Sequence, residues 1–206
     1  MLRLGAPSAA IVLIGFAMIG FAHGQPIRSR IGEPAVNACV AAANSGRHDD
    51  SAVQACSEAL TQDGLTRVTA VALLINRGAM RLRRKEAAAA LADFDAAIDR
   101  DAKSPEAYVN RGAALVALGR PGPAVAALTE ALSLGLKEPH KAFFNRGAAR
   151  EALGDARGAL EDYEAALAIK PDWEAVEQEL ARFVRTRRDQ LAERLEVQGD
   201  AEPDSE

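Results

Sequence analysis

Large and small apolar residues recur with a fixed period through the centre of the chain. Gly78, Gly112 and Gly147 stand 34 and 35 residues apart, and each closes an Asn-Arg-Gly triplet. Residue sizes repeat around each glycine, with a large apolar residue four positions before it, a bulky one 16 after it, and alanines 12 and 19 after it. The large apolar residues before the glycines are Leu74, Tyr108 and Phe143, and the bulky residues 16 positions after them are Phe94, Leu128 and Tyr163. The alanines 12 positions after the glycines are Ala90, Ala124 and Ala159, and those 19 positions after them are Ala97, Ala131 and Ala166. Such agreement through three copies predicts a repeated structural unit.

The residue sizes in these columns predict a pair of antiparallel helices in each unit. Glycine inside a helix costs about 1 kcal/mol relative to alanine, so we expect a second helix to cross there at close range. The two alanines supply small residues on that second helix, and the bulky residue between them fills the space beside the crossing. Each pair leaves an apolar face that a neighbouring pair must cover, which predicts an all-α stack of hairpins.

Turn residues lie where this arrangement requires the chain to reverse. Gly119 and Gly154 fall between the two helices of the second and third units, and glycine readily adopts the left-handed conformation that ends a helix. Pro105 and Pro123 suit a first helical turn, and Ser104 is placed to cap a helix. The first unit has Arg83-Arg84-Lys85-Glu86 at the corresponding turn.

The three units resemble the tetratricopeptide repeat, in which such glycine and alanine columns and a closing proline, here Pro171, are usual. Residues 71–172 carry the resemblance, with repeat 1 at 71–104, repeat 2 at 105–139 and repeat 3 at 140–172. It implies a right-handed superhelical solenoid of antiparallel helix pairs. The family's usual leucine before the glycine is here Arg77, Arg111 or Arg146. We expect these guanidinium groups to reach acidic neighbours such as Asp93, Asp95, Asp162 or Glu164.

Helical segments flank the three repeats. Residues 35–70 are interpreted as a degenerate first hairpin, preceded by a short flexible leader at 25–34. Residues 173–197 predict a capping helix with an apolar stripe at nearly helical spacing. That stripe comprises Trp173, Val176, Leu180, Phe183 and Leu191. Its other face carries Arg182 and further charges and is expected to be solvated, and residues 198–206 predict a disordered acidic tail.

Cys39 and Cys56 fall at matching positions of the degenerate hairpin. When Ala59 is aligned with Ala97, Cys39 occupies the column of Arg77 and Cys56 the column of Phe94. The two cysteines are also equidistant from the turn at residues 47–48, which places them opposite each other in an antiparallel hairpin. We therefore expect a Cys39–Cys56 disulfide, worth about 3 kcal/mol for a loop of this length. The alternative is a pair of reduced core cysteines.

The first 24 residues have the pattern of a signal peptide. Arg3 precedes an apolar run over residues 9–22, and Ala22-His23-Gly24 offers small residues around a cleavage point. This run is shorter than the roughly 20 residues of a membrane span, so we expect cleavage, with an uncleaved anchor as the alternative. Together with paired cysteines it favours a periplasmic or secreted protein, with the Gram-negative periplasm as the expected compartment and no stable membrane anchor after cleavage.

Charge and motif content argue against several functions. The chain has 25 basic and 29 acidic residues, and with Arg3 and the five acids after Arg194 set aside, 24 of each remain. This balance gives no indication of nucleic-acid binding. No phosphate loop, nucleophile elbow or metal-binding motif occurs, and His48 and His140 form no metal pair with either cysteine. We expect no enzyme activity, no cofactor and no metal.

The resemblance also implies a concave face lined by the first helices of the repeats. Asn76, Asn110 and Asn145 share one column there, and a side-chain amide can both donate to and accept from a peptide backbone. The alternative is that each asparagine bonds locally within its helix pair. We expect the surrounding groove to be mainly apolar and to suit an extended peptide or a partner helix. Its lining is predicted to be Ile75, Val109, Phe144, Ala79, Ala113, Ala148 and Lys141.

These patterns together predict a protein–protein interaction module or scaffold of the cell envelope, with a protein or peptide partner that the sequence does not identify. Only Lys141 and Arg83 are basic on the groove columns, so a site that grips a peptide carboxylate is not expected. The alternative is a structural solenoid that self-associates, for instance as a homodimer, and holds no peptide.

Overall fold

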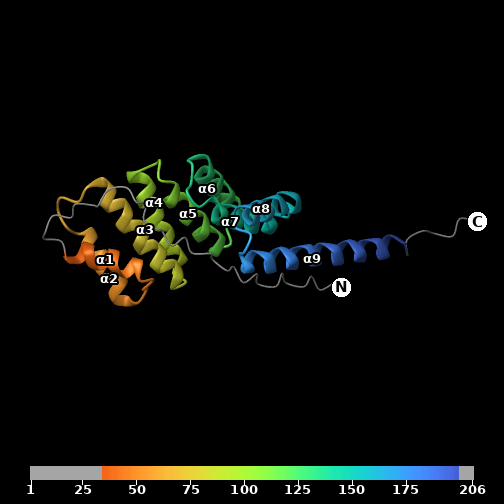
Figure 1. The fold of residues 1–206 in the computed structure, drawn as a ribbon, viewed down its shortest axis with the longest axis horizontal. Coiled ribbons are helices and arrows are strands. Elements are labelled where there is room, and N and C mark those ends of the chain that lie inside the picture. The colour runs from red at the N-terminus through yellow and green to blue at the C-terminus, as the bar shows by residue number, and fades with distance from the viewer. Residues whose placement is uncertain (1–33, 200–206) are drawn as a thin grey trace, which may run out of the picture.

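The computed structural model describes residues 34–199, with side chains up to residue 194, and this part of the chain consists of helices joined by short turns (Figure 1). Its helices are α1 (Pro34–Asn44), α2 (Asp50–Leu60), α3 (Arg67–Arg83), α4 (Ala87–Arg100), α5 (Pro105–Ala117), α6 (Pro121–Ser133), α7 (Pro139–Ala152), α8 (Ala156–Ile169) and α9 (Glu174–Gly199). The predicted all-α class is confirmed. None of these nine helices is long and apolar enough to cross a membrane. The predicted signal peptide at 1–24 lies outside the described residues.

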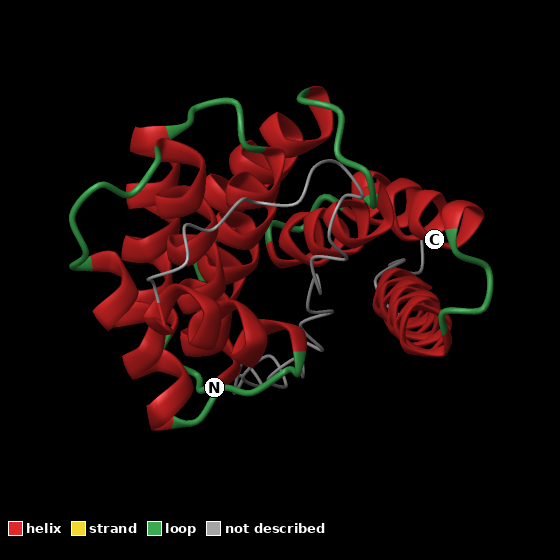
Figure 2. Cartoon of the chain, turned by 60° about the vertical axis from the view of Figure 1, so that its left-hand side comes forward, coloured by secondary structure: helices red, strands yellow, loops and turns green. Residues whose placement is uncertain are grey.

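The helices pack as successive antiparallel pairs, α1 with α2, α3 with α4, α5 with α6 and α7 with α8. The first helices of the pairs also contact one another, α1 with α3, α3 with α5 and α5 with α7. The second helices do not pack together in this way within residues 34–199. The first helices therefore form an inner layer and the second helices an outer layer, and the pairs follow a curved path (Figure 2).

Side-chain caps and left-handed residues define the ends of these helices. Ser104 caps α5 by accepting a hydrogen bond from the backbone N–H of Ala107, as the sequence predicted. Gly119 and Gly154 adopt φ values of 66° and 81° at the turns of repeats 2 and 3, which confirms their predicted left-handed conformation. Lys85 takes the same place in repeat 1 with φ 64°.

The glycine column marks the closest approach of the two helices in each repeat. A Cβ atom added to Gly78 would lie 2.6 Å from Cε1 of Phe94, and one added to Gly147 would lie 3.0 Å from Cδ1 of Tyr163. At Gly112 the added atom would clash with the side chain of Leu128. The predicted pairing of the glycine with the bulky residue 16 positions later is therefore correct in all three repeats.

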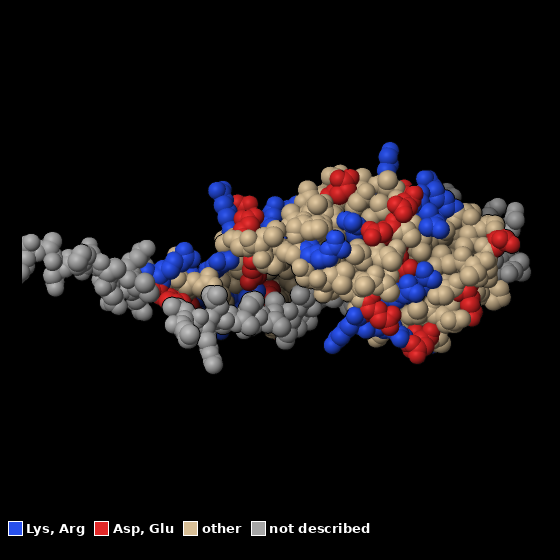
Figure 3. All heavy atoms as spheres, turned by 180° about the vertical axis from the view of Figure 1, so that it is seen from behind, with Lys and Arg blue, Asp and Glu red and all other residues tan. Residues whose placement is uncertain are grey.

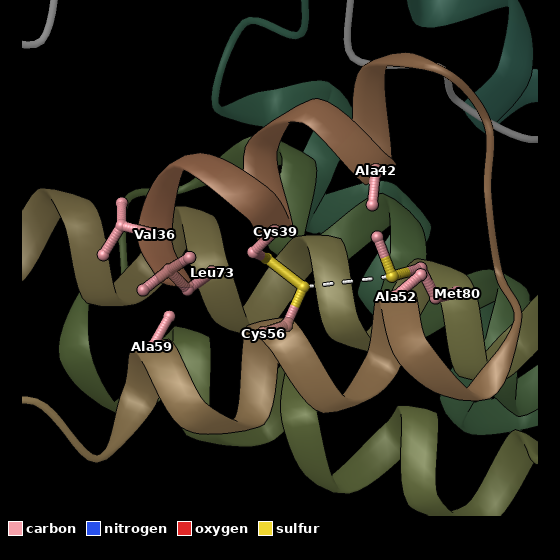
Figure 4. Close-up of a cluster of buried hydrophobic side chains, with 8 residues drawn as sticks. All are labelled: Val36, Cys39, Ala42, Ala52, Cys56, Ala59, Leu73 and Met80. Atoms are coloured by element: carbon pink, nitrogen blue, oxygen red, sulfur yellow. Dashed lines mark hydrogen bonds between the residues drawn. A yellow bond between two sulfur atoms is a disulfide. The ribbon is translucent and has the colours of Figure 1, made fainter. Parts of the chain in front are cut away.

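A disulfide joins the two helices of the leading hairpin, as predicted. Cys39 of α1 and Cys56 of α2 are bonded and fully buried, and Sγ of Cys56 lies 3.9 Å from Sδ of Met80 in α3 (Figure 4). The surrounding core residues come from α1, α2 and α3 and are Val36, Ala42, Ala52, Ala59, Leu73 and Met80. The hairpin is thus fixed internally by the disulfide and externally by packing on repeat 1.

The last helix, α9, packs on the third repeat and then extends beyond it (Figure 1). Val176 and Phe183 are buried against Phe144 of α7 and Tyr163 of α8. The ring of Trp173, just before the helix, lies 5.3 Å from that of Phe144 between centroids. Residues 198 and 199, predicted as part of a disordered tail, belong to the helix.

Candidate functional site

The three asparagines of the predicted binding column lie on the inner layer, one each on α3, α5 and α7. Asn76 is half-buried, whereas Asn110 and Asn145 are only 5% and 2% exposed. The Nδ2 group of Asn110 donates a hydrogen bond of 2.8 Å to the backbone carbonyl of Glu106, one turn earlier in α5. For Asn110 this is the local bonding that the sequence left open as the alternative.

Asn145 differs from Asn110 because its amide oxygen has no partner. The Oδ1 atom is buried and forms no hydrogen bond within the described residues. A buried acceptor without a partner typically costs about 1–3 kcal/mol. Asn145 therefore differs from Asn110 in leaving a buried acceptor unpaired.

Three residues predicted to line the groove are instead buried in the core. Ile75, Val109 and Phe144 are each 3–4% exposed. Ile75 packs with Ala107 of the next repeat, Val109 shares a cluster with Ala142 of the next, and Phe144 packs under the capping helix. The column beside the asparagines thus seals each repeat against its successor, and it offers little apolar surface to a ligand.

The remaining predicted lining residues retain only part of their surface. Ala79 and Ala148 are half-buried, and Ala113 is buried with Phe94 and Leu82 between repeats 1 and 2. Lys141 donates a hydrogen bond of 2.8 Å to Glu138, which lowers the pKa of that carboxyl group. The basic residue of the predicted groove is thus already paired with an acid of its own chain.

The arginine column before the glycines forms ion pairs with acidic residues, as predicted. Each guanidinium group meets a carboxylate on a second helix at 2.6–2.7 Å, and the pairs are Arg77 with Asp93, Arg111 with Asp95, and Arg146 with Asp162. Asp93 and Asp162 are buried and each accepts from a further arginine, Arg81 or Arg150. Repeat 2 lacks this arrangement because alanine and leucine replace the buried acid and the second arginine.

Two of these arginines also connect neighbouring repeats. Arg77 donates to the hydroxyl of Ser57 in α2, and Arg146 donates to the hydroxyl of Thr129 in α6, both at 3.2 Å. Arg111 pairs with Asp95 of the preceding repeat. Ser57, Asp95 and Thr129 stand two residues before the last alanine of their units, so all three contacts follow one rule. The column is a joint between repeats, consistent with a structural role.

A polar network closes the inner layer at its C-terminal end. The hydroxyl of Tyr163 donates a hydrogen bond of 2.9 Å to Glu151. The pKa of Tyr163 is raised, mainly because the hydroxyl is buried and secondly because the Glu151 carboxylate is nearby. Arg182 of α9 bridges Glu151 and Glu179, although the sequence placed Arg182 on a solvated face. Because Glu151 and Arg182 are 31 residues apart, only the docking of α9 brings them together.

Surface charges of both signs alternate with uncharged surface on the face shown in Figure 3. Among the described residues no group of three or more His, Cys, Asp or Glu side chains could hold a metal ion. His140 is buried with its ring edge against Trp173, and burial lowers the pKa of the imidazole. Of the small and amide side chains predicted to line the inner layer, only Asn76, Ala79 and Ala148 retain part of their surface.

Comparison with known proteins agrees with this geometry. The tetratricopeptide repeat family matches residues 105–134 and 140–172, which correspond to repeats 2 and 3. No curated protein sequence matches the chain. Repeat 1 lies outside the matched segments, and it is the repeat with Lys85 in place of the turn glycine.

Solved structures share the same architecture. The tetratricopeptide domain of Arabidopsis OM64 is 25% identical, with 59% of this chain and 99% of that one covered and a TM-score of 0.55. The first such domain of Spaghetti (RPAP3), solved with the HSP90 peptide SRMEEVD, is 24% identical over 62% of this chain and 99% of that one, with a TM-score of 0.55. MamA is 21% identical over 79% and 86%, with a TM-score of 0.62. Residues 105–134 and 140–172 are thus similar to tetratricopeptide repeats, and the described residues share the fold of tetratricopeptide repeat proteins, a right-handed superhelical solenoid of antiparallel helix pairs followed by a C-terminal capping helix.

Proposed function

We propose that this protein is an interaction module or scaffold of the cell envelope that binds an extended peptide segment or a partner helix on its inner layer. The carrying observation is that α3, α5 and α7 contact one another in series and repeat the same asparagine and alanine positions along one face. An extended peptide has its own regular spacing of N–H and C=O groups, which a repeated amide can meet. The peptide held by Spaghetti supports this class of ligand for the fold.

The inner layer favours backbone recognition over recognition of a charged peptide end. Lys141 is paired with Glu138, and Glu151 is paired with Arg182 and hydrogen-bonded to Tyr163. The half-buried Ala79 and Ala148 leave room for a peptide backbone to approach closely. The partner segment is accordingly expected to be extended and mainly uncharged.

Binding is tested with random extended peptides selected against the folded protein. A variant with Asn76→Ala, Asn110→Ala and Asn145→Ala should lose affinity for selected peptides by at least about tenfold, since each hydrogen bond contributes about 0.5–1.5 kcal/mol. Fluorescence anisotropy measures the affinity, and circular dichroism with thermal unfolding verifies the fold.

The matched control changes three exposed residues of the outer layer, Gln54→Ala, Ser133→Ala and Glu164→Ala. This control should bind the selected peptides like the unmodified protein. If the asparagine variant remains folded and keeps its full affinity, the inner layer is not the binding face.

The envelope location rests on the predicted signal peptide and on a disulfide, a bond that persists in oxidising compartments. In a Gram-negative host we expect the protein in the periplasmic fraction, with its N-terminus at Gln25. A full-length protein retained in the cytoplasm with both thiols alkylatable would contradict the proposed location.

A further inference from the structure

By its place in the sequence, α9 begins where the first helix of a fourth repeat is expected, and it packs on α8. Counting 34 residues on from Gly147 leads to Ala181 in the first half of α9. In each complete repeat the residue of this column is in contact with a bulky side chain of the second helix. Ala181 is exposed, and Val184 is 52% exposed although its counterpart in repeat 2, Leu115, is fully buried.

Within residues 34–199 the chain does not turn back to form a second helix against α9. Seven residues after the glycine column, Lys85, Gly119 and Gly154 adopt positive φ and end the first helix of their repeats. The corresponding residue after Ala181 is Arg188, and α9 continues through it. At 26 residues the helix is about 39 Å long, and its second half protrudes beyond the repeats (Figure 1).

The uncovered face of α9 forms one side of a shallow pocket of about 500 Å³. Its apolar floor is made by Leu180, Ala181 and Val184 of α9 with Leu167 of α8, and Glu177 and Arg188 line its charged ends. Leu167 and Leu180 are half-buried, so the floor is incompletely covered. A helix laid along this face would cover it as a second helix does within each complete repeat.

The protruding half of α9 has the features of such a covering helix. Glu177, Ala181, Val184, Arg188 and Leu191 follow one another at intervals of four, three, four and three residues, so they share one helix face. Leu191 is 56% exposed. The first half of α9 therefore has the small Ala181 exposed on this face, and its second half has the bulky apolar Leu191 exposed on the same face.

Charge selects the orientation of two such helices. The first turn and a half of α9 contains Glu174, Glu177 and Glu179, whereas arginines predominate from residue 182 to 194. An antiparallel arrangement places the acidic half of each helix beside the basic half of the other. In the register that sets Ala181 opposite Leu191 of a second copy, Val184 faces Arg188 and Glu177 faces position 195, next to Arg194. A two-fold axis produces each of these contacts twice.

We propose that α9 is a homodimerisation helix, in which the protruding half of each copy covers the open α8–α9 face of the other and completes its fourth repeat. The occupant of this face is a second copy of the chain, and the contact leaves the inner layer accessible. This inference does not rest on peptide binding, since the two surfaces share none of the residues that are changed to test them.

Sedimentation of the mature chain from micromolar to several hundred micromolar concentration tests the proposal. We expect a monomer–dimer equilibrium with twice the monomer mass at the upper end. Val184→Arg, which would face Arg188 of the second copy, and, separately, Glu177→Arg, which would lie beside Arg194, should each raise the dimer Kd by at least about tenfold, since like charges that face each other at a contact cost more than about 1.4 kcal/mol. The control Arg157→Glu, at a 91% exposed side chain on α8, should leave the Kd unchanged.

A charge exchange tests the register. Arg194→Glu should weaken the dimer as Glu177→Arg does, and the double variant should restore association because the opposite charges face each other again. A monomeric protein at every concentration, or a dimer unaffected by Val184→Arg in a folded protein, would overturn the proposal. The triple asparagine variant should still dimerise, so failure of peptide binding and failure of dimerisation are distinguishable.

Discussion

Single residues of one column have different energetic roles in different repeats. Asp162 is 3% exposed at its side chain and accepts from both Arg146 and Arg150, whereas Asp95 is 47% exposed and accepts from Arg111 alone. The charge of Asp162 is thus removed from water and balanced by two guanidinium groups. The pair formed by Asp95 remains hydrated, so its Coulomb attraction is largely screened.

We therefore expect Asp162→Asn to destabilise the protein by about 3 kcal/mol, because it leaves the partly buried Arg146 without a counter-charge and Arg150 with only Asp155, at 3.8 Å. The matched change Asp95→Asn should cost less than about 1 kcal/mol. Urea unfolding of the two variants measures both values. Similar losses at the two positions would contradict the difference that burial implies.

At the scale of elements, the sequence was most informative at positions where a single steric requirement favours one type of residue. The glycine columns and the turns at Gly119 and Gly154 were predicted correctly because a close crossing leaves no room for a Cβ atom and a positive φ strongly favours glycine. The burial of Ile75, Val109 and Phe144 between repeats was not predictable in the same way. Whether such a residue faces a groove or the next repeat depends on the angle between successive pairs, which no local pattern records.

At the turn of repeat 1 we expect a substitution that stabilises the protein, whereas most substitutions destabilise it. Lys85 has φ 64°, which costs a residue with a Cβ atom about 1–2 kcal/mol, while glycine adds about 0.5–1 kcal/mol of chain entropy. Lys85→Gly should therefore stabilise the protein by up to about 1 kcal/mol in thermal or urea unfolding. Gly154→Ala, the reverse exchange at φ 81°, should destabilise it, and the same sign for both would exclude this explanation.

At the scale of the whole molecule, stability is distributed along the array because each pair contacts mainly its neighbours. The two ends are held by different means. The leading hairpin has its disulfide and its packing on α3, and the last repeat is covered by α9 with aromatic contacts and the bridge from Arg182 to Glu151. Removing the disulfide or the α9 contacts should therefore destabilise the adjacent helices before the rest of the array.

Removing the disulfide by Cys39→Ala with Cys56→Ala should destabilise α1 and α2 by about 3 kcal/mol, the loop-closure contribution expected for this bond. Hydrogen exchange should accelerate over residues 34–60 and remain nearly unchanged over α5 to α8. Exchange that accelerates equally along residues 34–194 would indicate that the solenoid unfolds as one cooperative unit.

The sequence by itself determined the helix pairs, their period, the cysteine pair and the arginine–aspartate pairing, because each depends on side-chain size or charge at fixed spacing within one or two repeats. The tertiary structure alone decided which inner positions remain accessible, how Asn110 and Asn145 differ, and that Arg182 reaches Glu151. It also decided that α9 leaves an open face and a protruding half. These features depend on the curvature of the stack and on the docking of distant helices, which arise only when all pairs pack together.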